Sequence, residues 1–497
     1  MKNVIAILGI GICLNACSLD TIPTDRYVEN SFWQTEEQVD AGLTACYNTL
    51  RDTYLFGGTA SAIFNETITP NAYMYDNTYG FGVIGKGMHT PSNSTVINEK
   101  WGSCYKGIGR CNTFLNKIET YEMAEDIKNQ KIAEVKFLRA LYYFELTNYY
   151  GDAPLILDPP DVDAQKDLPR NSKSEILNQI IKDLIEAASI LPGEYSSSGD
   201  LGRPTSGAAK SLLSRVYLYN SMWEEAEIVA SEVINSGKYS LYPDYHQIFS
   251  RDNENNSEVI FDIQFLNPDY KHGMDLIMRQ YNTCAPLLDL VKAYEMNDGT
   301  PYDDNKPLYE NRDPRFYQTI VYPGSQYMGL PVANDRFKFT GYTFKKFSVY
   351  DEEYVQEYDY NDINYIVIRY ADILLTYAEA RNEVLSAPDK GVYDALNQIR
   401  DRETVKMPLF DISKGYTKEE MRDIIRHERR IELAGEGHYY FDILRWRTAK
   451  DVMNGPIYKY DDSTIEVRVF EDKDYLWPIP ETETKENPNL LPNNIGW

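Results

Sequence analysis

Paired amphipathic runs constrain the fold of this chain more than any other feature of its sequence. Between residues 206 and 237, apolar and small residues recur at helical spacing in two runs, separated by a turn near Trp223. This spacing predicts two antiparallel helices joined as a hairpin. Similar pairs follow at 369–402 and 417–446. A hairpin can bury its apolar stripe only against a neighbouring hairpin, so the pattern predicts a curved scaffold of stacked helices.

The length of each pair is that of a tetratricopeptide-like unit, about 34 residues, although the strict repeat signature is absent. Further helices are predicted from capping boxes at 35–38 and 172–175, and from apolar stripes at 101–115 and 132–142. Alternating residues at 259–265 and 465–469 predict short strands. The expected fold is therefore mainly α, with tetratricopeptide-like helix pairs and few strands.

A loop-rich segment interrupts the helical pattern. From about residue 266 to residue 362 helical periodicity mostly fails, while Gly, Pro, Asp and Tyr accumulate. A stretch this long without regular structure is usually functional. Length alone suggests about three domains, but no Pro/Gly/Ser linker divides the chain. We therefore expect one interrupted domain over residues 17–497.

The first 16 residues have the pattern of a signal peptide. Lys2 precedes an apolar stretch that is too short to span a membrane, and Ala16 stands directly before Cys17. This arrangement predicts lipidation of Cys17, whose acyl chains would hold the mature protein on a membrane. The alternative is an ordinary secretory signal in which Cys17 is incidental.

Charge and cysteine content narrow the function further. The net charge of −26 becomes −27 when residues 1–16, with Lys2 as their one charged residue, are removed. Such a chain repels phosphate backbones, so nucleic acid is not an expected partner. Cysteine and histidine spacing predicts no metal site, and the motifs GxSxG, HExxH and the phosphate loop are absent. The cysteines after Cys17 are interpreted as small core residues: Cys46, Cys104, Cys111 and Cys284.

A dense run of charges from Glu428 to Arg445 has the appearance of a catalytic site. These charges alternate with apolar residues such as Ile431 and Leu444, however. That pattern is typical of a partly buried ion-pair network, in which each charge must be paired. We interpret the run, together with Arg369, Asp372 and Glu379, as structural.

Tyrosine is the strongest signal for binding. The chain has 41 tyrosines against 18 phenylalanines, and many of the tyrosines lie in predicted loops. A tyrosine ring offers an apolar face to a sugar or peptide, and its hydroxyl can bond to a polar rim. The alternative is that these rings pack onto their own loops. The candidate ligand contacts are Tyr73, Tyr75, Asp76, Tyr79 and Phe81 in the loop at 70–82, and Tyr270, Tyr281, Tyr327 and Tyr342 in the loop-rich segment.

Cofactor binding is not expected, with one alternative. The acidic segment at 351–360 could hold Ca²⁺, which prefers clustered carboxylate oxygens. Neither this segment nor the one at 298–310 has EF-hand spacing, so a solvated acidic loop is the favoured interpretation.

Five stretches follow one another along the chain: 31–35, 137–144 with 150–154, 368–375 with 378–380, 427–433 with 436–437 and 441–446, and 476–480 with 487–490. Together, in this order, they resemble the SusD/RagB family of outer-membrane nutrient-binding lipoproteins. His438 departs from the family pattern, which commonly has Arg there, and should weaken a local salt bridge.

The resemblance implies four tetratricopeptide-like helix pairs and an irregular insert, with an N-terminal part at about 21–235 and a C-terminal part at about 255–497. It also implies a lipid-anchored protein that faces outward from the outer membrane and covers a SusC-like TonB-dependent transporter. Family ligands are mostly glycans, and some members bind peptides.

Three hypotheses follow. The first is a glycan-binding surface protein without enzymatic activity, and the second is a peptide-binding relative on the same scaffold. The third is a secreted all-helical glycosidase, which would need two facing carboxylates about 5 to 9.5 Å apart. The sequence offers no recognisable acid/base pair of this kind.

Overall fold

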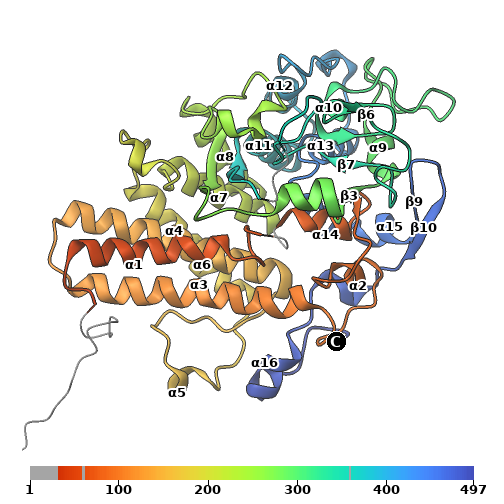
Figure 1. Ribbon diagram of the computed structural model, residues 1–497. Coiled ribbons are helices and arrows are strands. Elements are labelled where there is room, and N and C mark those ends of the chain that lie inside the picture. Colours follow the sequence, from red (N-terminus) through yellow and green to blue (C-terminus); the bar gives the residue numbers. More distant parts are fainter. Residues whose placement is uncertain (1–31, 59–61, 357–359) are drawn as a thin grey trace, which may run out of the picture.

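Long helices build one end of the molecule. The computed structural model describes residues 32–58, 62–356 and 360–497. Figure 1 shows the first long helices side by side, with the elements of the loop-rich segment at the opposite end. The capping boxes predicted at Thr35 and Ser172 are both present, at the starts of α1 and α6. These helices are α1 (Glu36–Asn48), α3 (Thr95–Thr120), α4 (Glu125–Tyr150) and α6 (Lys173–Ile190).

Successive helices then pack in a ladder. Helix α4 packs against α3 and α6, α6 against α7, α7 against α8, and α8 against α11, which also contacts α12 and α13. Each new helix buries the apolar stripe of the one before it, as a stack of hairpins requires. The predicted mainly α fold is confirmed. The later helices are α7 (Ser206–Tyr219), α8 (Trp223–Asn235), α11 (Tyr370–Val384), α12 (Lys390–Arg400), α13 (Lys418–Glu432) and α14 (Tyr439–Arg445).

The strands are short and occur in antiparallel pairs. The two predicted from alternation are present as β2 (Val259–Ile263), which pairs with β8 (Tyr365–Arg369), and β10 (Thr464–Arg468), which pairs with β9 (Gly455–Tyr458). Three further two-residue pairs organise the loops. They are β1 (Ala72–Tyr73) with β3 (Ala285–Pro286), β4 (Ile320–Val321) with β7 (Thr343–Phe344), and β5 (Gln326–Tyr327) with β6 (Leu330–Pro331).

Short helices fill the remaining chain, including parts of the segment predicted to be irregular. Each of these helices has only one or two turns, which is too short to show a periodic apolar stripe in the sequence. The short α-helices are α2 (Phe81–Gly85), α5 (Val162–Gln165), α9 (Leu288–Ala293), α10 (Pro314–Thr319), α15 (Ala449–Met453) and α16 (Glu481–Glu486). Other short helical elements include the 3-10 helices η1 (Thr49–Arg51) and η2 (Ala62–Ile68) and the π-helix η6 (Leu276–Tyr281). Within the described ranges, no helix is both long enough and apolar enough to cross a membrane.

The cysteines of the described chain are small core residues, as predicted. Cys46, Cys104, Cys111 and Cys284 are free thiols with no exposed surface. Burial raises the pKa of the Cys104, Cys111 and Cys284 thiols, which suppresses the reactive thiolate. In an unacylated chain that begins at residue 18, we expect Ellman's reagent to label no thiol in the folded protein and all four after unfolding. Rapid labelling of the folded chain would contradict this packing.

A buried network of ion pairs joins the last helices of the ladder to the chain around β2 and β8. Arg369, at the start of α11, pairs with Glu258 before β2, and with Glu432 and Glu436 around the end of α13. Arg402, after α12, pairs with the same Glu258 and Glu432. All five side chains are at most 1% exposed. The charges predicted to be structural therefore hold four separate parts of the chain together.

A second charged group runs along the other side of α13. Arg429 pairs with Asp372 and Asp442, and Arg445 pairs with Glu379. The interpretation of the run from Glu428 to Arg445 as a paired, buried network is confirmed. His438, where the family pattern has Arg, is held uncharged near neutral pH, because burial and then Arg215 lower its pKa to about 4.

Glu66 makes the stability of the fold depend on pH. Its carboxylate accepts hydrogen bonds from Asn71 and from the backbone N–H of Gly437, yet burial raises its pKa to about 7. A raised carboxyl pKa contributes stability below the unfolded value of 4.5, and that stability is lost as the pH rises toward 7.

The Glu66→Gln variant lacks this titration. We therefore expect its free energy of unfolding, relative to the parent, to rise by about 2 to 3 kcal/mol between pH 4.5 and pH 7.5. Urea unfolding of both proteins across this range measures the difference. A difference that stays constant with pH would show that Glu66 is ionised in the folded protein throughout.

Candidate functional site

Two aromatic rings from distant parts of the chain stack on each other at the surface. The Tyr75 and Phe339 ring centroids lie 3.8 Å apart, with planes inclined by 6°. Pairing of β1 with β3 places the loop at 70–82 beside the chain that leaves η6, and so beside Tyr281. Tyr75 and Phe339 are half-buried, and Tyr281 is 48% exposed. We call Tyr75, Tyr281 and Phe339 the aromatic platform.

The tyrosine hydroxyls and nearby charges give the aromatic platform a polar edge. Burial raises the pKa of Tyr75, and the charge of Asp76 and the hydroxyl of Tyr281 add to the increase. The Lys338 ammonium lies 5.0 Å from the centre of the Phe339 ring. The site therefore combines flat apolar faces with a phenol, a carboxylate and an ammonium at their rim, which suits recognition of a polyhydroxylated ligand.

The other residues predicted in the loop at 70–82 have different positions. Tyr73 is half-buried on β1, and burial raises its pKa. Tyr79 is half-buried against Phe64. Asp76 accepts a hydrogen bond from the backbone N–H of Thr78, which tightens the turn. Phe81 is only 1% exposed and packs on Phe64, so it belongs to the core and is withdrawn from the candidate ligand contacts.

The four tyrosines predicted in the loop-rich segment separate into two groups. Tyr281 and Tyr270 are each 48% exposed, but the ring of Tyr270 is covered by the Arg51 guanidinium, 3.8 Å from its centre. Tyr327 and Tyr342 are 1% and 0% exposed. Tyr327 lies in a small core cluster between β5 and the following loop, and the Tyr342 hydroxyl bonds to that of Tyr309. Neither buried ring can contact a ligand in this structure, and both are withdrawn.

Phe339 was missed by sequence reasoning. It follows Phe337 and Lys338 in a turn-rich stretch, and Phe337 is buried while Phe339 is not. The sequence signal for Phe339 was the placement of two aromatic residues, one on each side of Lys338. Only the fold, however, brings Phe339 over Tyr75.

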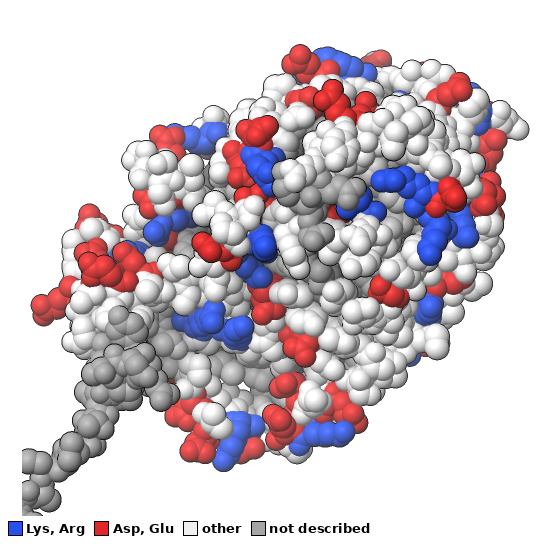
Figure 2. All heavy atoms as spheres, in the orientation of Figure 1, with Lys and Arg blue, Asp and Glu red and all other residues white. Residues whose placement is uncertain are grey.

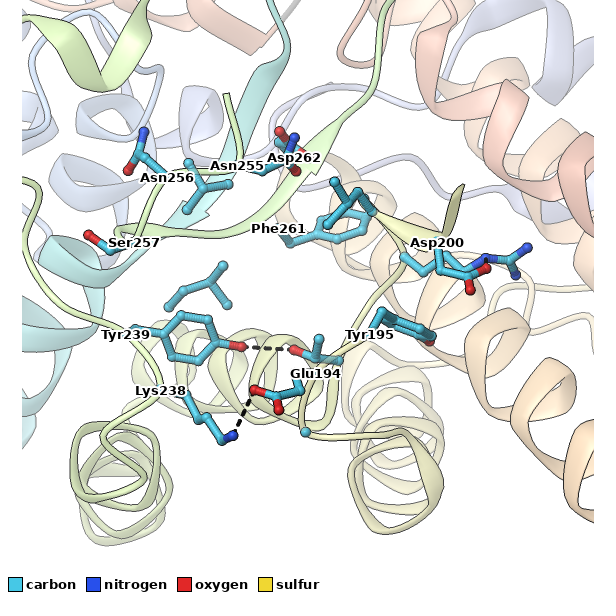
Figure 3. Close-up of a pocket in the computed structure, with 17 residues that line it drawn as sticks. Glu194, Tyr195, Asp200, Lys238, Tyr239, Asn255, Asn256, Ser257, Phe261 and Asp262 are labelled. Carbon is cyan, nitrogen blue, oxygen red and sulfur yellow. Dashed lines mark hydrogen bonds and ion pairs between the residues drawn. The ribbon is translucent and has the colours of Figure 1, made fainter. Parts of the chain in front are cut away.

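A separate polar pocket lies between the loop that joins α6 to α7 and the segment that leads into β2. Figure 3 shows Tyr239 and Lys238 on one side of this pocket, Tyr195 and Asp200 on the other, and Phe261 above. Its volume is about 260 Å³. The lower end of the size range for ligand sites is about 300 Å³, so the pocket is small for an oligosaccharide.

The carboxylates of this pocket are already engaged. Glu194 pairs with Lys238, and Asp200 pairs with Arg203. Asp262 accepts hydrogen bonds from Gln264 and Asn364, and burial raises its pKa to about 6. These residues therefore do not present two facing carboxylates that are free to act as acid and base, as glycoside hydrolysis requires.

The acidic segment considered for Ca²⁺ is partly engaged by basic side chains. Asp351 bonds to His246 at 2.8 Å and to Lys345 at 3.0 Å, and Glu352 lies 3.7 Å from Lys345. Residues 357–359 lie outside the described residues, as do residues 1–16 and Cys17. In the ranges that the structure describes, no group of three or more His, Cys, Asp or Glu side chains is arranged to hold a metal ion.

Figure 2 shows acidic and basic side chains interspersed over one face of the molecule, between wide uncharged areas. The net charge of −26 is thus not gathered into one continuous acidic field on this face. Charges of both signs therefore border the uncharged areas of this face.

Comparisons with known proteins agree with this architecture. A solved structure of a SusD-like carbohydrate-binding protein from Bacteroides fragilis has a TM-score of 0.85 and 28% identity, over 92% of this chain and 99% of that one. A SusD-like protein of Formosa agariphila is 24% identical over 99% of this chain and 98% of its own length. A SusD-like protein of Bacteroides ovatus is 27% identical over 90% of this chain and 82% of its own length.

Two family models match successive parts of the chain. One, described as starch-binding associating with outer membrane, matches residues 19–218. The other, described as the SusD family, matches residues 245–497, which is more than half of the chain. With the five sequence stretches, the helical ladder and these matches in agreement, the chain belongs to the SusD/RagB family.

Proposed function

We propose that this protein is a non-enzymatic surface lipoprotein that captures glycans at the aromatic platform and passes them to a TonB-dependent transporter in the outer membrane. The observation that carries the proposal is the stacked, partly exposed Tyr75–Phe339 pair beside the exposed Tyr281 on a SusD-family scaffold. The similar B. fragilis structure is described as carbohydrate-binding, which supports the choice of ligand class.

The platform suits a sugar for a physical reason. The C–H face of a pyranose ring packs on aromatic faces, and its hydroxyls seek hydrogen-bond partners at the rim. Tyr75 and Tyr281 bring a face and a hydroxyl together, and Asp76 and Lys338 supply an acceptor and a donor. Because the rings lie at the surface rather than in a closed cavity, we expect a chain of several sugar units to bind better than a monosaccharide.

Isothermal titration calorimetry of residues 18–497 against a panel of neutral oligosaccharides tests the ligand class. We expect heat of binding for at least one glycan, and affinity that increases with chain length. An array of peptides screened in parallel tests the alternative of a peptide-binding relative. Binding of peptides with no heat for any glycan would replace the proposed ligand class, and release of reducing sugar by the pure protein would overturn the absence of enzymatic activity.

The membrane anchor rests on Cys17 and its preceding Ala16. We expect Cys17 to carry the acyl chains, so mass spectrometry of the mature protein should find a lipid-modified N-terminal cysteine. In a Cys17→Ala variant the protein should no longer fractionate with the outer membrane. A mature chain that begins elsewhere, without lipid, would remove the anchor from the proposal.

The family description places its members at the outer membrane, which is where a transporter partner would have to lie. Affinity purification of the lipidated protein from detergent-solubilised membranes should recover a TonB-dependent barrel. Recovery of the lipoprotein alone, under conditions that preserve other outer-membrane complexes, would argue against the partnership.

A further inference from the structure

A large open cavity of about 830 Å³ lies where the start of α6, the turn between α7 and α8, the end of α14 and the C-terminal segment meet. None of its lining residues belongs to the aromatic platform. Its volume is within the range of small-molecule sites, about 300 to 1,000 Å³. Its wall combines the rings of Tyr219, Phe441 and Tyr475 with cationic side chains and the amide of Asn493.

The charge of this cavity is opposite to that of the chain. Its lining contains five cationic side chains and two carboxylates, although the whole chain has a net charge of −26. Both carboxylates are engaged: Asp472 pairs with Lys450, and Asp152 accepts a hydrogen bond from the backbone N–H of Lys173. The five cations are Arg170, Lys173, Arg445, Arg447 and Lys473.

Two of these cations form ion pairs, and three form none within the described part of the chain. Arg445 pairs with Glu379 and Asp442, and Lys473 with Glu471. The Arg170 guanidinium donates only to neutral oxygens of the C-terminal segment. Lys173 and Arg447 form no ion pair among the described residues, and burial and then Arg447 lower the pKa of Lys173. Asp152 opposes this shift only in part. Neighbouring like charges with little counter-charge are unfavourable, and a bound anion would compensate them.

Arg447 is also held in an unusual backbone position. Its φ is +60°, and it occupies the position after the C-cap of α14. The N–H groups of Arg447 and Thr448 donate to the carbonyls of Leu444 and Ile443, at 3.1 and 3.0 Å, which is the hydrogen-bond pattern of a Schellman motif. Glycine is the favoured residue at this position, because an L side chain is strained there. The exposed Arg447 guanidinium lies over the Tyr475 ring, 4.5 Å from its centre.

We propose that this cavity is a second binding site, for a sugar that carries a carboxylate or sulfate group. The Arg447 guanidinium supplies a planar pair of donors to the anionic group, and the Lys173 ammonium supplies a point charge beside it. The half-buried Phe441 ring provides an apolar face to the rest of a sugar, and the Asn148 side-chain nitrogen, which has no hydrogen-bond partner among the described residues, can donate to a hydroxyl. The site accounts for an Arg where the backbone favours Gly, and for cations that form no ion pair in an acidic protein.

The test uses calorimetry on residues 18–497 at low salt, with digalacturonate and galactose 6-sulfate as anionic probes and with neutral galactobiose and inorganic sulfate as comparisons. We expect at least one anionic sugar to bind, and the Arg447→Gly variant to weaken it by about tenfold or more, as loss of a charge-assisted contact does. Because Gly suits the backbone at 447, this variant should keep the melting temperature of the parent or exceed it. Lys173→Gln should weaken the same probe.

A matched control is Lys390→Gln, which removes an exposed positive charge on α12, away from the lining residues. It should leave binding of the anionic sugar unchanged, and so should the Tyr75→Ala, Phe339→Ala variant of the aromatic platform. Four results would overturn the second site: no binding of either anionic sugar, equal loss in Arg447→Gly and Lys390→Gln, equal binding of galactobiose and digalacturonate, or inorganic sulfate binding as tightly as the sugars. Glycan binding at the platform would be unaffected by any of them.

Discussion

Replacing Glu432 with glutamine is expected to lower the free energy of unfolding by about 3 to 5 kcal/mol, the usual cost of breaking a buried ion pair. The Glu432 carboxylate accepts hydrogen bonds from Arg369 and Arg402 at 2.8 Å each, and from Arg315 at 3.0 Å. Burial alone would raise its pKa, but Arg402, Arg369 and Arg315 hold the pKa of Glu432 well below its usual range.

The effect is large because three buried guanidinium groups are compensated by the one Glu432 carboxylate. Glutamine has the shape of glutamate, but it removes the negative charge and turns one acceptor into a donor that faces a guanidinium. The three arginines keep other carboxylate partners, among them Glu258 for Arg369, so the chain should still fold at low temperature. Their remaining positive charge is nevertheless buried with less compensation.

Denaturant unfolding followed by circular dichroism measures this loss. Glu419→Gln is the matched control, since Glu419 lies on the same helix with a side chain that is 73% exposed and only 3.9 Å from a single arginine. Its effect should stay within about 0.5 kcal/mol, as for most surface substitutions. Equal stabilities of the two variants would mean that the network contributes nothing to the fold.

Loss of the aromatic platform should have the largest effect on binding. For a glycan found in the calorimetric panel, we expect the Tyr75→Ala, Phe339→Ala variant to bind about 100-fold more weakly, because two stacking faces worth about 1 to 1.5 kcal/mol each are removed. Each ring also supports the other at 3.8 Å, so the single variants should each lose a large part of the effect. Calorimetry against the same oligosaccharide measures the change.

The control for this variant is Tyr416→Ala. Tyr416 is half-buried and stacks on Tyr393 at 6.4 Å, but it lies between α12 and α13 rather than at the platform. It should leave affinity unchanged. A double variant at the platform that folds normally and binds with the affinity of the parent would remove Tyr75 and Phe339 from the ligand site.

Tyr270 stays a prediction, since its ring is exposed but covered by Arg51.

The sequence by itself determined the features that depend on local order. Helix positions followed from spacing, and capping boxes at Thr35 and Ser172 follow from residues three positions apart. The role of the charges around Glu432 was also predictable, because charges that alternate with apolar residues on one helix must be buried and paired. These signals need no knowledge of the partner residues.

Tertiary structure alone decided which aromatic residues can meet a ligand. Tyr75, Phe81, Tyr327 and Tyr342 have similar loop-rich surroundings in the sequence, yet only Tyr75 of these four is left partly exposed. Its partner Phe339 reaches it because β1 pairs with β3, and β3 in turn contacts β7, which begins shortly after Phe339. Exposure is set by what the rest of the chain packs against a ring, and contacts between residues far apart in the sequence leave no trace in local spacing.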